Sequence, residues 1–459
     1  MALLSHIAGK PRIFGSRFWA ASRAQECLKC RTSRPWSGEV NGLIRGETEA
    51  KEGNITASTD HISQERMLSL DVFRGLTVAA MLLVKDPGNL DAYYWPLDHA
   101  EWHGWTPTDL IFPFFLFIVG ITTHLSLQAR RLRGDSQEAL LRQILRRTVA
   151  IFLLGLVLNW FPFYSIATIH GQEDPGIWQR IVHKVMFLRI PGVLQRIALC
   201  YLFGALLSLV VRWRGQVVIL IGLLLGYWAV LMLIPVPGSG LKGLPAIAEP
   251  SVTLSAWIDR GLFDWGDWGN HLWSLSKTWD PEGALSTLPA IGSVITGLLA
   301  GCWIGQDQML KRRVALLWSV GAVCFLAGLL WGNVLPINKK IWTSSFTLMS
   351  AGLAASVLAA LMLIIDLKGW RRWSAPFVVF GVNPILAYAL SHVALITIYF
   401  WWTVSLNGRQ VGAEYWIYDR VFASWLPDKA ASLGFALLFV FFFYLLLRFF
   451  YARRWILKL

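Results

Sequence analysis

Two histidines stand in one polar stretch of an otherwise apolar chain. The stretch reads PLDHAEWHGWTPTDLIFPFFLFIVG and covers residues 96–120. A neutral histidine acts as a general base or as a nucleophile that forms an acyl-imidazole. His99 and His103 are therefore candidates for proton transfer or acyl transfer, and the alternative is two ordinary loop residues that make hydrogen bonds.

The residues that follow predict how this loop is positioned. Thr106, Pro107 and Asp109 have the types and spacing of a helix start, in which Asp109 reaches back to close a capping box. We therefore predict an apolar helix that begins at Asp109. Its free N–H groups and partial positive charge then lie beside the two histidines, where they could stabilise a developing oxyanion.

Other ionisable residues stand inside or next to apolar segments, where charge is costly and is often functional. Asp71 and Arg74 are three residues apart, so they can pair on one helix face. Arg189 is expected at a membrane interface and Arg196 about two turns deeper, where it needs a partner or an anionic ligand. Asp71 and Arg74 could also be an anchor with its counter-charge.

Composition predicts the class of protein. The chain has 459 residues, 55% of them hydrophobic and 15% charged. A soluble protein carries about 25% charged residues. We therefore predict an all-α polytopic membrane protein that lies in a lipid bilayer. The net charge of +14 fits basic cytoplasmic loops and does not indicate nucleic-acid binding.

Apolar runs long enough to cross a bilayer predict about ten transmembrane helices. Basic clusters stand in every second loop, so the positive-inside rule places both termini in the cytoplasm and the loop of His99 outside. The expected spans are 68–86, 109–129, 147–165, 191–211, 216–236, 286–305, 314–334, 343–366, 374–400 and 432–450.

Two local features concern packing inside these spans. Gly297, Gly301 and Gly305 form a small-residue stripe that indicates close helix packing, within the bundle or in a homodimer. We favour the bundle. Asn383-Pro384 breaks the ninth span, either as a kink or to free carbonyl groups towards a cavity, and the kink is the favoured interpretation.

The N-terminal residues 1–65 are polar and lack a spanning segment. We interpret them as a disordered extension, although their composition resembles that of a transit peptide. Cys27 and Cys30 form a lone C-x-x-C pair without further ligands nearby, so no metal site is predicted.

Four stretches in this order resemble one known family. They are SLDVFRGLTVAAML, PLDHAEWHGWTPTDLIFPFFLFIVG, LRIPGVLQRIALCY and DPEGALSTLPAIGSVITGLLAG. Together they resemble the catalytic domain of heparan-alpha-glucosaminide N-acetyltransferase, and they look closest to its bacterial homologues. The resemblance runs from about residue 66 to the C-terminus, so residues 66–459 are interpreted as a transmembrane acyltransferase domain.

The resemblance implies acetyl transfer across a membrane. Acetyl-CoA would be the cytoplasmic co-substrate, without a metal, and an amino sugar on the periplasmic or lumenal side would be the acceptor. His99 matches the active-site histidine of the family and Asp109 the aspartate that follows it. Lys85 stands where the family has a catalytic asparagine. A bacterial inner membrane is the implied location.

The candidate site then has two groups of residues. His99, Asp109 and Lys85 are the catalytic candidates. The candidates for substrate or CoA binding are Asp71, Arg74, His103, Arg189 and Arg196. Two other interpretations remain: a transporter for a sugar or cell-wall precursor, which the broken helix would serve, and a non-catalytic homologue, which Lys85 would mark.

Overall fold

The computed structural model describes residues 67–166, 169, 174–306, 308–406 and 408–457, and nearly all of their regular elements are helices. The predicted N-terminal extension, with Cys27 and Cys30, lies outside the described residues. A metal-binding group of three or more His, Cys, Asp or Glu side chains is not found within the described part of the chain.

Eight of the described helices are long and apolar enough to cross a membrane. Each overlaps a predicted span, which confirms an all-α, multi-pass membrane protein; the total of ten spans stays a prediction. These helices are α3 with the preceding 3-10 turn (Pro107–Leu132), α6 (Val193–Val210), α7 (Trp213–Leu233), α10 (Ala284–Ile304), α11 (Leu310–Trp331), α12 with its π-helical end (Ser344–Leu367), α14 with its π-helical end (Pro384–Trp401) and α16 (Asp428–Ala452).

The two remaining predicted spans are also helices, but they carry more polar residues. Helix α2 (Leu68–Lys85) contains Asp71, Arg74 and Lys85. Helix α4 (Gln137–Trp160) begins ten residues before the predicted span 147–165 and ends five residues before its end. Ser136 caps α4 by accepting a hydrogen bond from the N–H of Ala139 at 3.2 Å. The first turns of α4 are polar and basic, so a prediction from hydropathy places the start of the helix too late.

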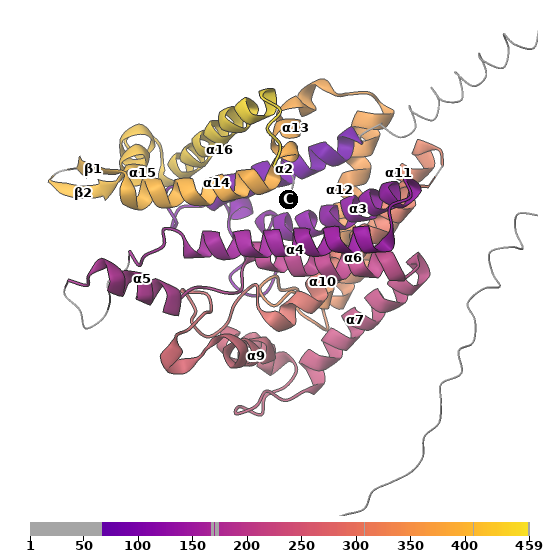
Figure 1. The fold of residues 1–459 in the computed structure, drawn as a ribbon, viewed down its shortest axis with the longest axis horizontal. Helices are drawn as coiled ribbons and strands as arrows, with labels where there is room; N and C mark the ends of the chain where they lie inside the picture. Colours follow the sequence, from indigo (N-terminus) through magenta and orange to yellow (C-terminus); the bar gives the residue numbers. More distant parts are fainter. Residues whose placement is uncertain (1–66, 167–168, 170–173, 307, 407, 458–459) are drawn as a thin grey trace, which may run out of the picture. The chain divides into compact units, whose positions relative to one another are not determined.

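Shorter elements connect the long helices. Helix α5 (Ile177–Met186) and the antiparallel hairpin of β1 (Thr403–Leu406) and β2 (Arg409–Gly412) lie at the end of the long helices opposite the α3–α4 turn (Figure 1). The other short elements are α8 (Leu244–Ala248), α9 (Leu254–Phe263), α13 (Ala375–Val382), α15 (Ala413–Ile417), the 3-10 turns Trp95–Leu97, Pro250–Val252, Gly266–Trp268 and Arg372–Ser374, and the π-helical turn Tyr418–Ala423.

Helix α10 lies at the centre of the bundle and packs against α3, α6, α7 and α12. The glycine stripe allows this packing. A Cβ atom at Gly297 would lie 2.1 Å from the carbonyl oxygen of Phe117 in α3, and one at Gly301 would lie 3.1 Å from Ile121. Only glycine lets the two backbones approach so closely. The stripe therefore serves the internal bundle, as the favoured interpretation predicts, and a homodimer stays a prediction.

The helix break at Asn383-Pro384 is present. Helix α13 ends at Val382 and α14 begins at Pro384, which has no N–H to continue the ladder. The side chain of Asn383 donates to the carbonyl of Trp455 at 2.9 Å and accepts from the N–H of Leu457 at 3.0 Å. The amide of Asn383 thus binds the C-terminal segment, which fits a packed kink.

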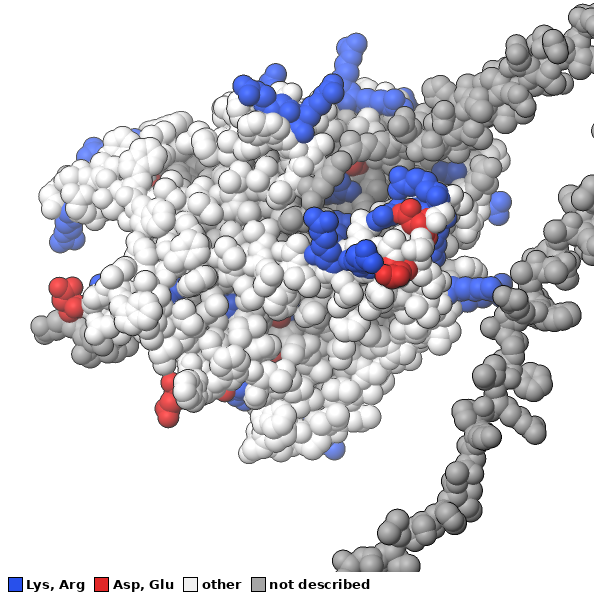
Figure 2. Space-filling model, viewed as in Figure 1, with Lys and Arg blue, Asp and Glu red and all other residues white. Residues whose placement is uncertain are grey.

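Lys and Arg side chains are concentrated at one end of the bundle. Figure 2 shows a group of them over the α3–α4 turn, whereas most of the visible face carries no charge. That turn contributes Arg130, Arg131 and Arg133. The positive-inside rule assigns this end to the cytoplasm. The cytoplasmic location of both termini stays a prediction from this rule.

Candidate active site

The loop that carries His99 folds back onto the first turn before α3. Two threonines of this turn bind the loop. The hydroxyl of Thr106 donates to the carbonyl of Asp98 at 2.6 Å, and the hydroxyl of Thr108 donates to the carbonyl of Pro96 at 3.0 Å. His99 is therefore placed beside the start of the helix, as the sequence predicts.

Asp109 is the buried centre of this turn. Its carboxylate is 2% exposed and accepts hydrogen bonds from the backbone N–H groups of Thr106 at 3.0 Å and Ala100 at 3.1 Å. The bond to Thr106 confirms that Asp109 reaches back to the capping residue. The α-helix itself begins at Ile111 rather than at the predicted Asp109, because residues Pro107–Leu110 form a 3-10 turn.

His99 and Asp109 form a direct pair. The Nδ1 atom of His99 lies 2.7 Å from Oδ1 of Asp109. Because an ionised carboxylate only accepts hydrogen bonds, Nδ1 carries the proton and Nε2 is left with its lone pair. The His99 side chain is 51% exposed, so Nε2 can reach a substrate. An oriented imidazole of this kind is the arrangement of a general base.

Lys339 also belongs to this group, although it lies 240 residues further along the chain. Its Nζ is 3.3 Å from Oδ1 of Asp109 and 3.2 Å from Nδ1 of His99. Since Nδ1–H is directed at Asp109, the ammonium group pairs with the carboxylate. Burial lowers the pKa of Lys339, and the carboxylates of Asp109 and Glu282 act in the opposite direction.

Sequence analysis did not identify Lys339. One signal for it was present: Lys339 and Lys340 are adjacent cations in a loop that the positive-inside rule places outside, against the general charge bias. Lys340 has a different role, because its Nζ donates to the backbone carbonyl of Glu101 in the His99 loop.

His103 does not join the pair of His99 and Asp109. It is exposed, and its Nδ1 lies 3.4 Å from the side-chain nitrogen of Asn338. Partial burial of the ring lowers the pKa of His103. The ring centre of His103 also lies 6.1 Å from that of Trp102. A role of His103 in substrate binding stays a prediction.

Lys85 ends helix α2 and has partners of its own. Its Nζ donates to the hydroxyl of Ser391 at 2.8 Å and lies 4.6 Å from the ring centre of Tyr388. Within the part of the chain that the structure describes, Lys85 makes no hydrogen bond to His99 or Asp109. A catalytic role of Lys85 therefore stays a prediction.

Asp71 and Arg74 pair as predicted, at 3.4 Å, and Arg74 also donates to the carbonyl of Gly381 at 3.2 Å. The pair lies near the other end of α2. Arg74 is 11 residues before Lys85, which is about 16 Å along a helix axis. The pair is thus separate from the His99 group, and CoA binding there stays a prediction.

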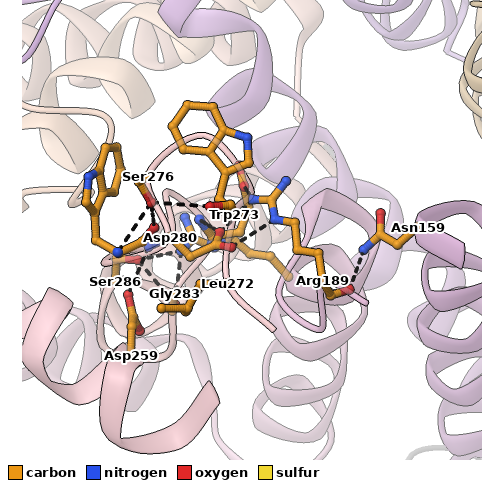
Figure 3. A network of polar contacts seen from close by, with 12 residues as sticks. Asn159, Arg189, Asp259, Leu272, Trp273, Ser276, Asp280, Gly283 and Ser286 are labelled. Atoms are coloured by element: carbon orange, nitrogen blue, oxygen red, sulfur yellow. Dashed lines mark hydrogen bonds and ion pairs between the residues drawn. The ribbon is translucent and has the colours of Figure 1, made fainter. Parts of the chain in front are cut away.

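The two remaining arginines bind residues just before or at the start of α10, and Figure 3 shows Arg189 beside Asp280. Arg189 binds both carboxylate oxygens of Asp280, through Nε at 2.8 Å and Nη2 at 2.6 Å, and it also contacts Glu282. Arg196 is fully buried. It donates to the carbonyl of Gly283 at 3.1 Å and the hydroxyl of Ser286 at 2.5 Å.

Arg196 satisfies the predicted need for a partner only in part. Its guanidinium carbon lies 5.3 Å from the ring centre of Trp342, which stacks beneath it. Its Nε and Nη1 atoms are buried and have no hydrogen-bond partner among the described residues. Asp280, Glu282 and Gly283, which sequence analysis noted only within the stretch DPEGALSTLPAIG, are therefore central to this second polar group.

Residues 66–241 match the sequence model of a family described as heparan-alpha-glucosaminide N-acetyltransferase, catalytic. The chain is 29% identical to heparan-alpha-glucosaminide N-acetyltransferase of Homo sapiens over 406 residues, which are 77% of this chain and 58% of the human protein. The resemblance to this family is confirmed.

Two further relatives are similar over comparable lengths. The Mus musculus heparan-alpha-glucosaminide N-acetyltransferase is 29% identical over 408 residues, 77% of this chain and 58% of the mouse protein. The potassium-transporting ATPase potassium-binding subunit of Pseudomonas entomophila (strain L48) is 22% identical over 347 residues, 72% of this chain and 59% of the subunit. The chain thus spans 58% of the length of the two N-acetyltransferases.

The match to the heparan-alpha-glucosaminide N-acetyltransferase catalytic family covers only part of the site. The matched range 66–241 contains Lys85, His99, Asp109, Arg189 and Arg196. The other half of both polar groups lies beyond that range, in Asp280, Glu282 and Lys339. The tertiary structure therefore adds residues that the family match alone does not include.

Replacement of Lys339 by glutamine is expected to lower the melting temperature of the detergent-solubilised protein. The carboxylate of Asp109 is 2% exposed, and Nζ of Lys339 lies 3.3 Å from its Oδ1. Removing one partner of a buried ion pair is destabilising, because the remaining charge loses its compensation. The measurement is a thermal unfolding assay.

Lys340→Gln is the matched control, because Lys340 is the next residue and binds a backbone carbonyl of the same loop. Its melting temperature is expected to stay close to that of the wild type. An equal shift in both variants would show that only the general charge of the loop matters.

Proposed function

We propose that the chain is a transmembrane acyltransferase that moves an acetyl group from cytoplasmic acetyl-CoA to an amino sugar on the periplasmic or lumenal side. The observation that carries this proposal is the 2.7 Å bond between His99 and Asp109, which leaves Nε2 of His99 available as a base. The similarity to proteins named heparan-alpha-glucosaminide N-acetyltransferase supports acetyl transfer as the reaction.

The chemistry assigned to this pair is general base and then general acid catalysis. Nε2 of His99 takes a proton from the acceptor amine as the amine nitrogen attacks the thioester carbonyl carbon. The C–S bond breaks, and the thiolate leaves with the proton that His99 returns. Asp109 holds the imidazole in the tautomer that this transfer needs and stabilises the imidazolium that forms.

A second route uses the same residues. In that route Nε2 of His99 attacks the thioester itself, and the acyl-imidazole then passes the acetyl group to the amine. The contact of Nδ1–H with buried Asp109 strengthens Nε2 both as a proton acceptor and as a nucleophile, so it supports either route. A trapped acetyl group on His99 would identify the acyl-imidazole route.

Lys85 is proposed to contact the transferring acetyl group from a neighbouring position. Its ammonium group lies 4.6 Å from the ring centre of Tyr388 and donates to Ser391, both in helix α14. An ammonium group can donate a hydrogen bond to a carbonyl oxygen, as the asparagine that the resemblance places there would.

The positive-inside rule supports the sidedness of this proposal. The basic α3–α4 turn is assigned to the cytoplasm, and the loop of His99 lies at the opposite end of α3. In a bacterial cell the corresponding location is the inner membrane. The transporter interpretation loses part of its support, because the amide of Asn383 binds the C-terminal segment and is not left free for a ligand.

The test is acetyl transfer by the purified full chain in detergent. Labelled acetyl-CoA is supplied with and without glucosamine, and wild type is compared with Lys85→Asn. We expect label on the sugar with wild type, and kcat for Lys85→Asn within about tenfold of it, since both side chains can donate one hydrogen bond. Absence of label on the sugar with both proteins would overturn the proposed reaction with this acceptor.

A further inference from the structure

One carboxylate oxygen of Glu282 accepts no hydrogen bond from the described residues. Its Oε2 contacts Nη2 of Arg189, whereas Oε1 has no hydrogen-bond partner among the described residues. The side chain is 11% exposed, so this oxygen is not sealed in the core. A fixed carboxylate with a free acceptor position is suited to bind a donor group of a ligand.

The surroundings hold Glu282 in place. Arg189 forms a fork with both oxygens of Asp280 and then reaches Glu282 with one of the same nitrogens. The backbone N–H of Glu282 also donates to Oδ1 of Asp280 at 2.9 Å. The main chain and the side chain of Glu282 are therefore both positioned by the arginine–aspartate pair, which reduces the cost of ordering them on binding.

The charges around Arg189 favour a cation or a strong hydrogen-bond donor. One guanidinium group contacts two carboxylates, those of Asp280 and Glu282. Asp280 receives the bidentate contact (Figure 3). The other cations that Glu282 influences have partners elsewhere. Lys339 lies 3.3 Å from Asp109, and Arg196 donates to Gly283 and Ser286. Glu282 is thus the less completely paired of the two carboxylates.

Aromatic contacts join this group to the loop of His99. The rings of Trp102 and Trp279 lie 5.4 Å apart, and those of Trp273 and Trp279 lie 5.6 Å apart. Trp102 is three residues after His99, and Trp279 is three residues before Glu282. Trp279 is buried, so these packed rings connect the loop of His99 to the segment that leads to Glu282.

We propose that Glu282 recognises the amino group of the acceptor, with Arg189 and Asp280 as its positioning residues. This inference rests on the proposed acetyl transfer and specifies how the acceptor is chosen. The free oxygen of Glu282 accepts a hydrogen bond from the amino group, in its charged or neutral form. A sugar that has a hydroxyl group in place of the amine loses the charge-assisted part of this contact.

The experiment is a binding titration that does not depend on catalysis. Glucosamine and glucose are titrated into the detergent-solubilised full chain without acetyl-CoA, and Kd is measured by calorimetry for wild type, Glu282→Gln, Glu282→Asp and Glu101→Gln. Wild type is expected to prefer glucosamine over glucose by about tenfold or more, because the contact involves a charged group. Glu282→Gln is expected to abolish this preference.

Two variants serve as controls. Glu101→Gln removes an exposed carboxylate from the His99 loop and is expected to keep the wild-type preference. Glu282→Asp keeps the charge on a shorter side chain and is expected to retain part of the preference. The inference is overturned if wild type does not prefer glucosamine, or if Glu282→Gln, folded by its melting temperature, keeps the full preference.

The outcome separates this inference from the proposed reaction. Loss of glucosamine preference in Glu282→Gln, together with no acetyl transfer by wild type, would support the recognition site and contradict the reaction. Acetyl transfer by wild type with an unchanged KM for glucosamine in Glu282→Gln would support the reaction and overturn the recognition site. If both proposals hold, Glu282→Gln has a higher KM for glucosamine than the wild type and an unchanged KM for acetyl-CoA.

Discussion

Replacement of His99 by alanine is expected to lower kcat/KM for acetyl transfer by about 10²–10⁴-fold, the usual contribution of general acid–base catalysis. Alanine removes the Nε2 atom that takes the proton and leaves Asp109 without its 2.7 Å partner. The fold should survive, because the His99 side chain is 51% exposed and Asp109 keeps two backbone N–H donors and Lys339.

The matched control is His103→Ala, four residues further along the same loop. His103 is also exposed, but its side chain contacts Asn338 at 3.4 Å rather than Asp109. We expect kcat to stay within about threefold of wild type, because His103 does not face the carboxylate that orients a base. Equal losses in the two variants, or near-wild-type turnover by His99→Ala, would contradict the assigned role of His99.

Replacement of Arg189 by methionine is expected to be the most destabilising of these changes. The side chain of Asp280 is completely buried, and both its oxygens bind Arg189. Removing one partner of a buried ion pair leaves an uncompensated charge and costs about 3–5 kcal/mol. The expected result is a large fall in the melting temperature of the detergent-solubilised protein, measured by a thermal unfolding assay.

Two further variants test whether this loss of stability comes from the unpaired carboxylate of Asp280. The double variant Arg189→Met, Asp280→Leu removes both charges and should recover part of the stability, since apolar replacement of a complete buried pair is often nearly neutral. Arg142→Met breaks the ion pair of Arg142 with Glu138, two side chains that are 78% and 80% exposed. This change should lower the free energy of unfolding by less than about 1 kcal/mol. A double variant less stable than Arg189→Met would argue against the explanation by charge.

Most of the helical architecture could be predicted from local patterns. Apolar runs of about 20 residues identify helices that can cross a bilayer, because length and hydropathy are properties of a continuous segment. The eight apolar helices follow these runs. Helix ends were less predictable: α4 begins at Gln137, among polar residues that form helical turns outside the apolar run.

The turn that carries Asp109 could also be predicted from the sequence. The spacing from Thr106 to Asp109 predicts a turn that places an acid at a helix start, next to the loop that carries the two histidines. The contact from Asp109 back to Thr106 spans three residues, so local geometry dictates it. The contact of Asp109 with His99 spans 10 residues and depends on how the loop folds back. The choice of His99 over His103 came from the resemblance to a family. In the structure, His99 contacts Asp109, whereas His103 contacts Asn338.

The chain by itself therefore determined a helical membrane protein, its small-residue packing stripe and the His99–Asp109 turn. The tertiary structure alone decided that Lys339 joins this pair from 240 residues away, and that Arg189 binds Asp280 and Glu282 across more than 90 residues. The physical reason is distance along the chain: residue types and periodicity describe each helix by itself, whereas only the packing of α3, α6, α10 and α12 brings their outer ends together.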